Sequence, residues 1–150
     1  MMLDMDHRHC EAIPRIETAN DPIHSLSDLR QRWRALMGPL GFGERALWCC
    51  FIGPERCFLK IYDRIPIGPR PQSRLLKDLM SGLQTVLDGI LPAGTTVALL
   101  LAGPGQGGVS AADRVWAKQL TEVATRFDVP LEPIFRANDE MLCAALPAAS

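Results

Sequence analysis

The stretch 95-TTVALLLAGPGQGGVSAADRVWAKQL-120 passes from an apolar run through a glycine-rich turn into a helical pattern. Residues Thr95–Ala102 predict a buried strand, because only apolar residues follow its two threonines. Ser110 predicts the N-cap of a helix, and a further strand is expected over Leu131–Arg136. Strand, loop, helix and strand in this order form a βαβ unit with parallel strands and a right-handed crossover. At least part of the sheet is therefore parallel.

The residues before this unit predict a helix followed by a hairpin. Ser25 is typical of an N-cap, apolar residues follow it at helical spacing, and Gly38 ends the helix. Ala46–Ile52 contains no charged residue, which predicts a central strand covered on both faces. A tight connection leads to a second strand, Cys57–Tyr62, in an antiparallel hairpin. The helix positions expected to be buried are Leu26, Leu29, Trp33, Leu36 and Met37.

The middle of the chain predicts an extended loop and a second helix. Asp63–Gln72 holds three prolines, which deny hydrogen bonds to both helix and sheet. Ser73 is expected to cap the helix that follows, and a short strand near Met141–Ala145 ends the chain. The predicted fold class is thus α/β: a single domain with a mixed β-sheet flanked by about three helices. Residues expected to face inward are Leu75, Leu76, Leu79, Leu83, Val86, Leu87 and Ile90 on this helix and Val115, Trp116, Leu120, Val123, Ala124 and Phe127 on the next.

The length and composition fit one globular domain. The chain has 150 residues, of which 47% are hydrophobic and 22% charged, so we expect a flexible lead-in over residues 1–22 and one α/β domain over 23–150. Its net charge of −1 makes nucleic acid an unexpected partner, since phosphate neutralisation needs clustered Lys and Arg. No apolar run is long enough to span a bilayer, and Met1–Asn20 lacks a signal-peptide pattern. A cytoplasmic protein without membrane contact is therefore expected.

The five cysteines do not form a disulfide framework. Their number is odd and no C-x-x-C spacing occurs. Cys49 and Cys50 are adjacent in a predicted strand, so their side chains point to opposite faces of the sheet. We therefore expect Cys49, Cys50 and Cys57 to be buried core residues with free thiols rather than nucleophiles.

The glycine-rich loop is the strongest local signal, because ligands of α/β folds bind where a strand ends and a helix begins. The loop contains a G-x-G-x-x-G string, but it lacks the lysine of a phosphate-binding P-loop, whose place is taken by Val109. Two interpretations remain open: a weak anion site made by backbone N–H groups, or a tight turn whose glycines permit positive φ. The candidate ligand-binding residues are Gly103, Gly105, Gly107, Gly108, Ser110 and Asp113.

The same stretch resembles the RadC-type JAB/MPN domain. That family's motif is His-x-His-Pro, a short glycine-rich run and then Pro-Ser-x-x-Asp. Ser110 and Asp113 match the Ser-x-x-Asp, and Pro104-Gly105 resembles the end of the first part. A strand pair, a proline-containing loop and a helix precede the motif strand in the family's order, so the resemblance covers about Ala46–Ala145. It implies a three-layer, cytidine-deaminase-like architecture.

The chain departs from the family at the metal site. The positions of the two histidines hold Leu101 and Gly103, or Leu100 and Ala102 in a register shifted by one. In active members those imidazoles and the aspartate hold zinc, and a glutamate activates the bound water. A catalytic zinc needs about three protein ligands, and only Asp113 remains. The resemblance therefore implies a domain without zinc and without hydrolase activity.

Other candidate sites are weaker. His7, His9 and Cys10 have side chains that bind zinc, but they lie in the predicted lead-in with no partner cluster, so no metal site is expected. Arg30 and Arg34 share one face of the first helix, which we expect to be a solvated face rather than a nucleic-acid surface. No catalytic residue and no cofactor is predicted.

Two functions follow from these patterns. The first is a non-catalytic JAB/MPN-like domain that works as a protein-binding or scaffolding module, alone or as a homo-oligomer. The alternative is a small phosphate- or nucleotide-binding protein or enzyme that uses the loop Gly103–Ser110.

Overall fold

The structure is a computed structural model that describes residues 13–145, apart from the side chains of residues 60–62. Its order of helix, two strands, helix, strand, helix and two strands confirms the predicted order. A short 3₁₀ helix precedes them, and residues 1–12 of the predicted lead-in lie outside the described residues. The elements are η1 (Ile16–Asn20), α2 (Leu26–Met37), β1 (Ala46–Ile52), β2 (Phe58–Pro66), α3 (Ser73–Gly89), β3 (Thr96–Ala102), α4 (Ala111–Arg126), β4 (Phe135–Ala137) and β5 (Leu142–Ala144).

The five strands form one mixed sheet in the order β2-β1-β3-β4-β5. Strand β3 runs parallel to β4, with α4 between them in the chain, and the other three neighbouring pairs are antiparallel. Strand β1 lies between β2 and β3, as expected for a central strand. The mixed sheet of a single α/β domain is thus confirmed.

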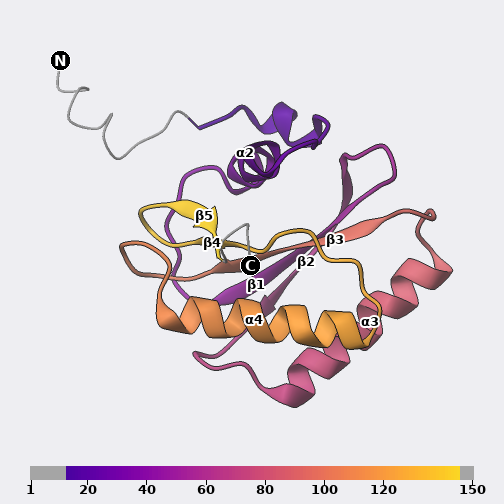
Figure 1. The fold of residues 1–150 in the computed structure, drawn as a ribbon. Coiled ribbons are helices and arrows are strands. Elements are labelled where there is room, and N and C mark those ends of the chain that lie inside the picture. The colour runs from indigo at the N-terminus through magenta and orange to yellow at the C-terminus, as the bar shows by residue number, and fades with distance from the viewer. Residues whose placement is uncertain (1–12, 146–150) are drawn as a thin grey trace.

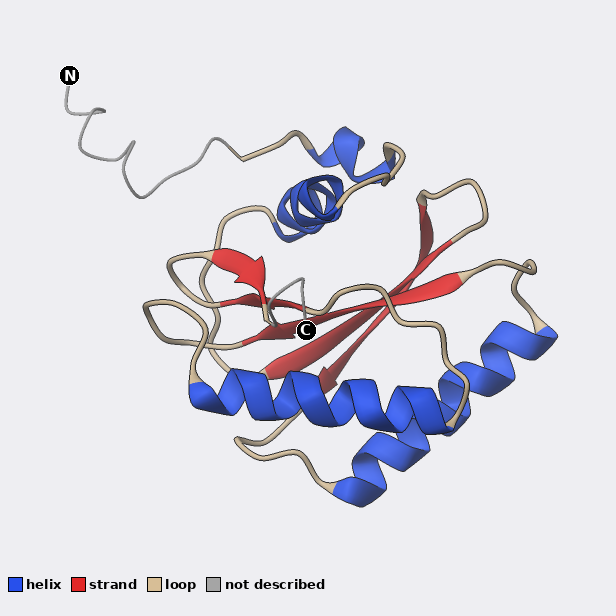
Figure 2. Cartoon of the chain, in the orientation of Figure 1, coloured by secondary structure: helices blue, strands red, loops and turns tan. Residues whose placement is uncertain are grey.

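Helices cover both faces of the sheet, which gives three layers (Figures 1 and 2). Helices α3 and α4 lie together on one face and α2 lies on the other. Successive residues of the strands point to opposite faces, so Cys49 and Leu99 pack against α3 and α4 while Cys50 and Leu100 pack toward α2. The predicted burial of Cys49 and Cys50 on opposite faces is confirmed.

Local sequence signals place the ends of α2 and the helix's buried face. The Ser25 hydroxyl accepts a hydrogen bond from the Asp28 N–H at 3.0 Å, which confirms the predicted N-cap. Gly38 ends the helix with a φ of 66°. Trp33 is fully buried and meets the Phe58 ring edge-on at 5.3 Å between ring centres. Leu26 was expected to be buried, but it is 38% exposed because it lies in the first turn of the helix.

Three predicted boundaries were wrong. Strand β2 runs on to Pro66, where a loop was expected, since β2 is an edge strand with a ladder on one side only. The cap of α3 is Gln72, without a side-chain hydrogen bond, and Ser73 is the first helical residue. The strand expected from Leu131 begins only at Phe135, and Leu131 makes just an isolated parallel bridge. Pro133 lies between them and lacks the N–H that a continuous ladder needs.

A few apolar residues lie elsewhere than predicted. Val115 is 47% exposed and Ile90 is 75% exposed, although both were expected to face inward. Ile90 follows the last residue of α3, so the helical spacing that placed it on the buried face no longer applies. Cys57 is half-buried in the turn before β2 rather than buried in a strand. Within the described residues, no helix is long and apolar enough to cross a membrane.

An ion pair ties the β1–β2 turn to the segment that precedes β4. Arg56 donates to both carboxylate oxygens of Glu132, at 2.7 and 3.2 Å, and the Thr96 hydroxyl donates to the same carboxylate. Burial raises the pKa of Glu132, but the hydrogen bonds from Arg56 and Thr96 and the charge of Arg56 outweigh it, so the pKa lies below its usual value. This acid therefore stabilises the fold above the pKa it has when unfolded, and that contribution is lost as the pH falls through its folded pKa.

Replacing Glu132 by glutamine is expected to lower the free energy of unfolding by about 1–2 kcal/mol at neutral pH, because a hydrogen-bonded charge is lost. Urea unfolding from pH 7 down to about 3 measures it, and the difference from the natural chain should shrink below about pH 4. The matched control is Glu17→Gln, since Glu17 pairs with Arg15 in an exposed ion pair that contributes little. A difference that stays constant with pH would contradict the assignment.

Candidate functional site

The glycine-rich loop joins the carboxyl end of β3 to the start of α4, beside the end of β4. A cavity of about 160 Å³ lies there, which we call the strand-end pocket. Five of the six predicted ligand-binding residues line it, and Gly107 does not. The lining residues are Arg45, Ile67, Leu101, Ala102, Gly103, Pro104, Gly105, Gln106, Gly108, Ser110, Asp113, Trp116, Arg136, Ala137 and Asn138.

Ser110 and Asp113 form the first turn of α4. The Ser110 hydroxyl accepts from the Asp113 N–H at 3.1 Å, and the Asp113 carboxylate accepts from the Ser110 N–H at 3.0 Å. This reciprocal pair is a capping box, so the predicted cap at Ser110 is confirmed. Asp113 thus already accepts a hydrogen bond from the protein.

Acidic side chains from the β4–β5 turn hold the glycine-rich loop. The Gly105 N–H donates to Asp139 Oδ2 at 3.0 Å, and the Gly107 N–H donates to Glu140 Oε1 at 2.7 Å. Both glycines have positive φ, 136° and 85°, which side chains rarely allow. Two of the amides that a phosphate would use are therefore bound to carboxylates of the chain itself.

Asp139 also links the loop to the segment before β1. Its Oδ1 accepts from the Phe42 N–H at 2.9 Å. The hydrogen bonds from Gly105 and Phe42 hold the pKa of Asp139 below its usual value. Because its folded pKa is lowered, Asp139 favours the bound loop above its ordinary pKa, and this contribution is lost as the pH falls through the folded value.

Replacing Asp139 by alanine is expected to speed hydrogen exchange at the Gly105 and Phe42 amides several-fold, with little effect on global unfolding. Amide exchange followed by NMR near pH 6 measures it. The control is Asp88→Ala, an exposed aspartate near the end of α3 and at the opposite end of β3 from the loop, which should leave both amides unchanged. Equal exchange in Asp139→Ala and the natural chain would show that this carboxylate does not hold the loop.

Arg136 on β4 is a candidate site residue that the sequence analysis did not single out. It is only 2% exposed, although it carries a full charge. Its Nη2 donates to the Gly107 carbonyl at 3.1 Å, and its Nε lies 3.3 Å from Asp113 Oδ2 in an ion pair without hydrogen-bond geometry. Its Nη1 has no hydrogen-bond partner among the described residues. A buried guanidinium thus lines the pocket with one nitrogen unused.

Arg45 also lines the strand-end pocket. A Cβ on Gly103 would come within 3.1 Å of Arg45 Cγ, so the glycine makes room for this side chain. No hydrogen bond or ion pair of the Arg45 guanidinium occurs within the described part of the chain. Asp113 is the only acidic side chain in the lining, and the two arginines give the pocket a net positive charge.

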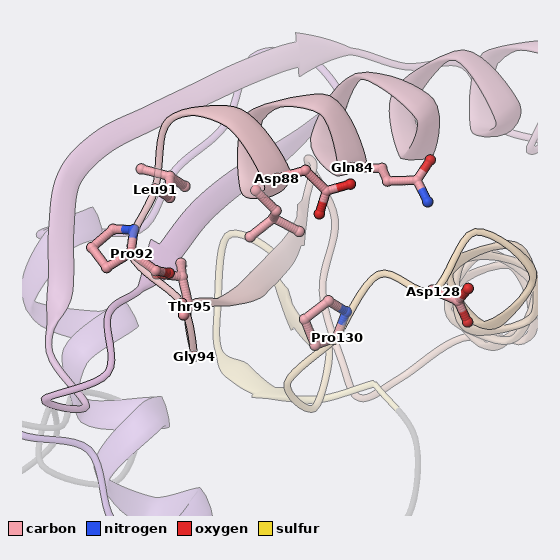
Figure 3. Close-up of a pocket in the computed structure, with 10 residues that line it drawn as sticks. Gln84, Asp88, Leu91, Pro92, Gly94, Thr95, Asp128 and Pro130 are labelled. Atoms are coloured by element: carbon pink, nitrogen blue, oxygen red, sulfur yellow. The ribbon is translucent and has the colours of Figure 1, made fainter.

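A second hollow, of about 540 Å³, lies at the opposite end of β3 (Figure 3). It is formed by the end of α3, the turn before β3 and the residues after α4, with Asp88 and Asp128 exposed at its surface. Gln84 donates to the Phe127 carbonyl and the Thr95 hydroxyl to the Pro92 carbonyl. This hollow is larger but has no buried unpartnered polar group, so the strand-end pocket is the better candidate site.

The described residues contain no metal-binding cluster, and two of their cysteines are buried thiols. They contain no group of three or more His, Cys, Asp or Glu side chains placed to hold a metal ion. Leu100 and Leu101 are core residues, and the carboxylate of Asp113 faces a guanidinium that would repel a second cation. Burial raises the pKa of Cys49 and of Cys50 to about 12. His7, His9 and Cys10 lie outside the described residues.

The arginines of α2 do not form the solvated face that was expected. Arg30 donates to the Leu142 carbonyl, and Arg32 donates to the carbonyls of Asp21 and Pro22. Arg34 is buried and donates to the Gly38 carbonyl. These side chains join α2 to neighbouring backbone carbonyls.

Comparison of the chain with known proteins adds no relative. No family model, curated protein or solved structure matches it. The candidate site therefore rests on the geometry of Arg136 and the strand-end pocket.

Proposed function

We propose that this protein is a non-catalytic binding module of JAB/MPN-like, three-layer architecture whose ligand or protein partner engages the strand-end pocket. The observation that carries the proposal is the environment of Asp113, the one residue retained from the family's ligand set. Its carboxylate accepts the Ser110 N–H and lies 3.3 Å from Arg136. A guanidinium takes the role of the cation at this position, and no histidine among residues 13–145 lines the pocket.

The arrangement of the elements supports the JAB/MPN part of the proposal. A hairpin, a proline-containing connection, a helix and a strand lead to the loop and to the helix with Ser110 and Asp113 at its start. This is the order that the resemblance implies. The loop lies at the carboxyl end of β3, where α/β folds place their ligands.

The alternative is a phosphate-binding protein. The side chain of Arg136 favours it, and not the backbone N–H groups of the loop that the sequence analysis expected. The amides of Gly105 and Gly107 are bound by Asp139 and Glu140, whereas Arg136 lines the pocket and its buried Nη1 has no hydrogen-bond partner among the described residues. This alternative and the binding module therefore share one site. They differ in the ligand, which the next subsection addresses.

Metal analysis of the purified full chain tests the non-catalytic proposal. After expression in zinc-supplemented medium and gel filtration, we expect far less than one zinc per chain. A variant with His7, His9 and Cys10 replaced by alanine is the control, because those residues would bind zinc outside the pocket. Stoichiometric zinc that persists in this variant and is lost in Asp113→Ala would overturn the proposal.

A further inference from the structure

We propose that the strand-end pocket binds a single small oxyanion group, a carboxylate or a phosphate, anchored on the guanidinium of Arg136. This inference rests on the proposed function, since it names the ligand class of the same site. The group that holds the anion is then a side chain of β4, and not the loop N–H groups that the sequence analysis singled out.

The first support is the incomplete hydrogen bonding of a buried charge. Arg136 is 2% exposed, and its Nη2 and Nε are engaged by Gly107 and Asp113. Its Nη1 has no partner among the described residues, and the residue lines the pocket. A buried charged donor without an acceptor is costly, so a bound acceptor oxygen stabilises it. Oxygens that carry negative charge give the strongest such bond.

The second support is the balance of charge around the pocket. Arg45 contributes a second guanidinium, and Asp113 is the only acid in the lining. The charge of Asp113 is offset by the Ser110 N–H and by Arg136 itself. Asp139 and Glu140 bind loop amides and do not line the pocket. The pocket therefore attracts an anion and repels a cation.

The third support is the size of the pocket. At about 160 Å³ it is smaller than the roughly 300–1,000 Å³ of sites that enclose drug-sized ligands. It has the volume for one charged head group and its neighbouring carbon atoms, and not for a whole nucleotide. Leu101 and Trp116 supply an apolar wall beside the two arginines. The rest of a larger ligand would lie outside the pocket.

Calorimetric and thermal-shift titrations of the full chain with inorganic phosphate and with sodium acetate test the proposal, with sodium chloride keeping the ionic strength constant. Binding to the native state raises the melting temperature. We expect phosphate, acetate or both to raise the melting temperature of the natural chain more than chloride does. Comparison of the two affinities shows which head group the pocket prefers. Arg136→Met should weaken that binding about tenfold or more, since a charge-assisted hydrogen bond is lost.

The controls separate loss of the site from loss of the fold. Arg126→Met removes an exposed arginine at the far end of α4, about 24 Å along the helix from its start, and should bind as the natural chain does. If circular dichroism shows that Arg136→Met does not fold, Arg45→Met decides, because the half-buried Arg45 lines the pocket. Weaker oxyanion binding in the deciding variant supports the proposal. The oxyanion proposal is overturned if neither anion stabilises the natural chain, or if the deciding variant binds with unchanged affinity. The proposed function is tested separately, by the metal analysis.

Discussion

Replacing Trp33 by alanine should lower the free energy of unfolding by about 3–5 kcal/mol, the range for removing a large aromatic side chain from a core. Trp33 is fully buried and packs edge-on against Phe58, so it holds α2 on its face of the sheet. The cavity left by this substitution cannot easily be filled by neighbouring side chains, because Leu29 and Leu100 in the same cluster are already buried. Urea unfolding at neutral pH measures the change.

Leu26→Ala is the matched control for this helix, because Leu26 is partly exposed and should change stability by much less. If Leu26→Ala and Trp33→Ala were equally destabilising, α2 would not be fixed on the sheet through Trp33.

Replacing Trp116 by alanine should lower the free energy of unfolding by a similar amount, about 3–5 kcal/mol, through the helical layer on the opposite face of the sheet. Trp116 is 1% exposed in the cluster that joins α4 to α3 and the sheet, and its indole N–H donates to the Pro69 carbonyl at 3.2 Å. It also lines the strand-end pocket, so oxyanion binding should weaken together with stability. Val115→Ala, one residue away and exposed, is the control.

The two tryptophans differ in one respect that phenylalanine substitutions detect. The Trp33 indole N–H has no hydrogen-bond partner among the described residues, whereas that of Trp116 has one. Trp116→Phe should therefore cost about 1 kcal/mol more than Trp33→Phe, the net contribution of an average hydrogen bond. The reverse order in urea unfolding would contradict this assignment of partners.

Local signals were sufficient where a residue acts on its own neighbours. The apolar run Ala46–Ile52 predicted β1 to the residue, and Ser25 and Ser110 predicted caps that the structure confirms. Such features depend on backbone geometry within a few positions. The element order and the mixed sheet follow from the same signals.

Tertiary position decided the rest. Pro66 is tolerated in β2 only because that strand lies at the edge of the sheet, which its own sequence does not indicate. Gly105 and Gly107 are held by Asp139 and Glu140, which lie more than thirty positions later in the chain. A pattern of glycines therefore indicated the right place but not its hydrogen-bond partners.

Arg136 was missed because a single arginine in a short strand resembles a surface residue. The signal that points to it is its position between Phe135 and Ala137 in the second strand of the βαβ unit. This strand has a neighbouring strand on each side, and all three of its residues are buried. A charged residue at such a position is unusual unless it is paired or binds a ligand. This reasoning needs the strand order, which only the fold provides.

The most direct test of the account is an NMR titration of arginine-labelled protein with inorganic phosphate and with acetate, following the guanidinium signals. The signal absent from the Arg136→Lys spectrum identifies Arg136. The account predicts that this signal shifts saturably with at least one oxyanion, while that of Arg126 does not move. An Arg136 signal that stays unchanged up to high concentrations of both anions would contradict the claim that this buried guanidinium is the anchor of a binding site.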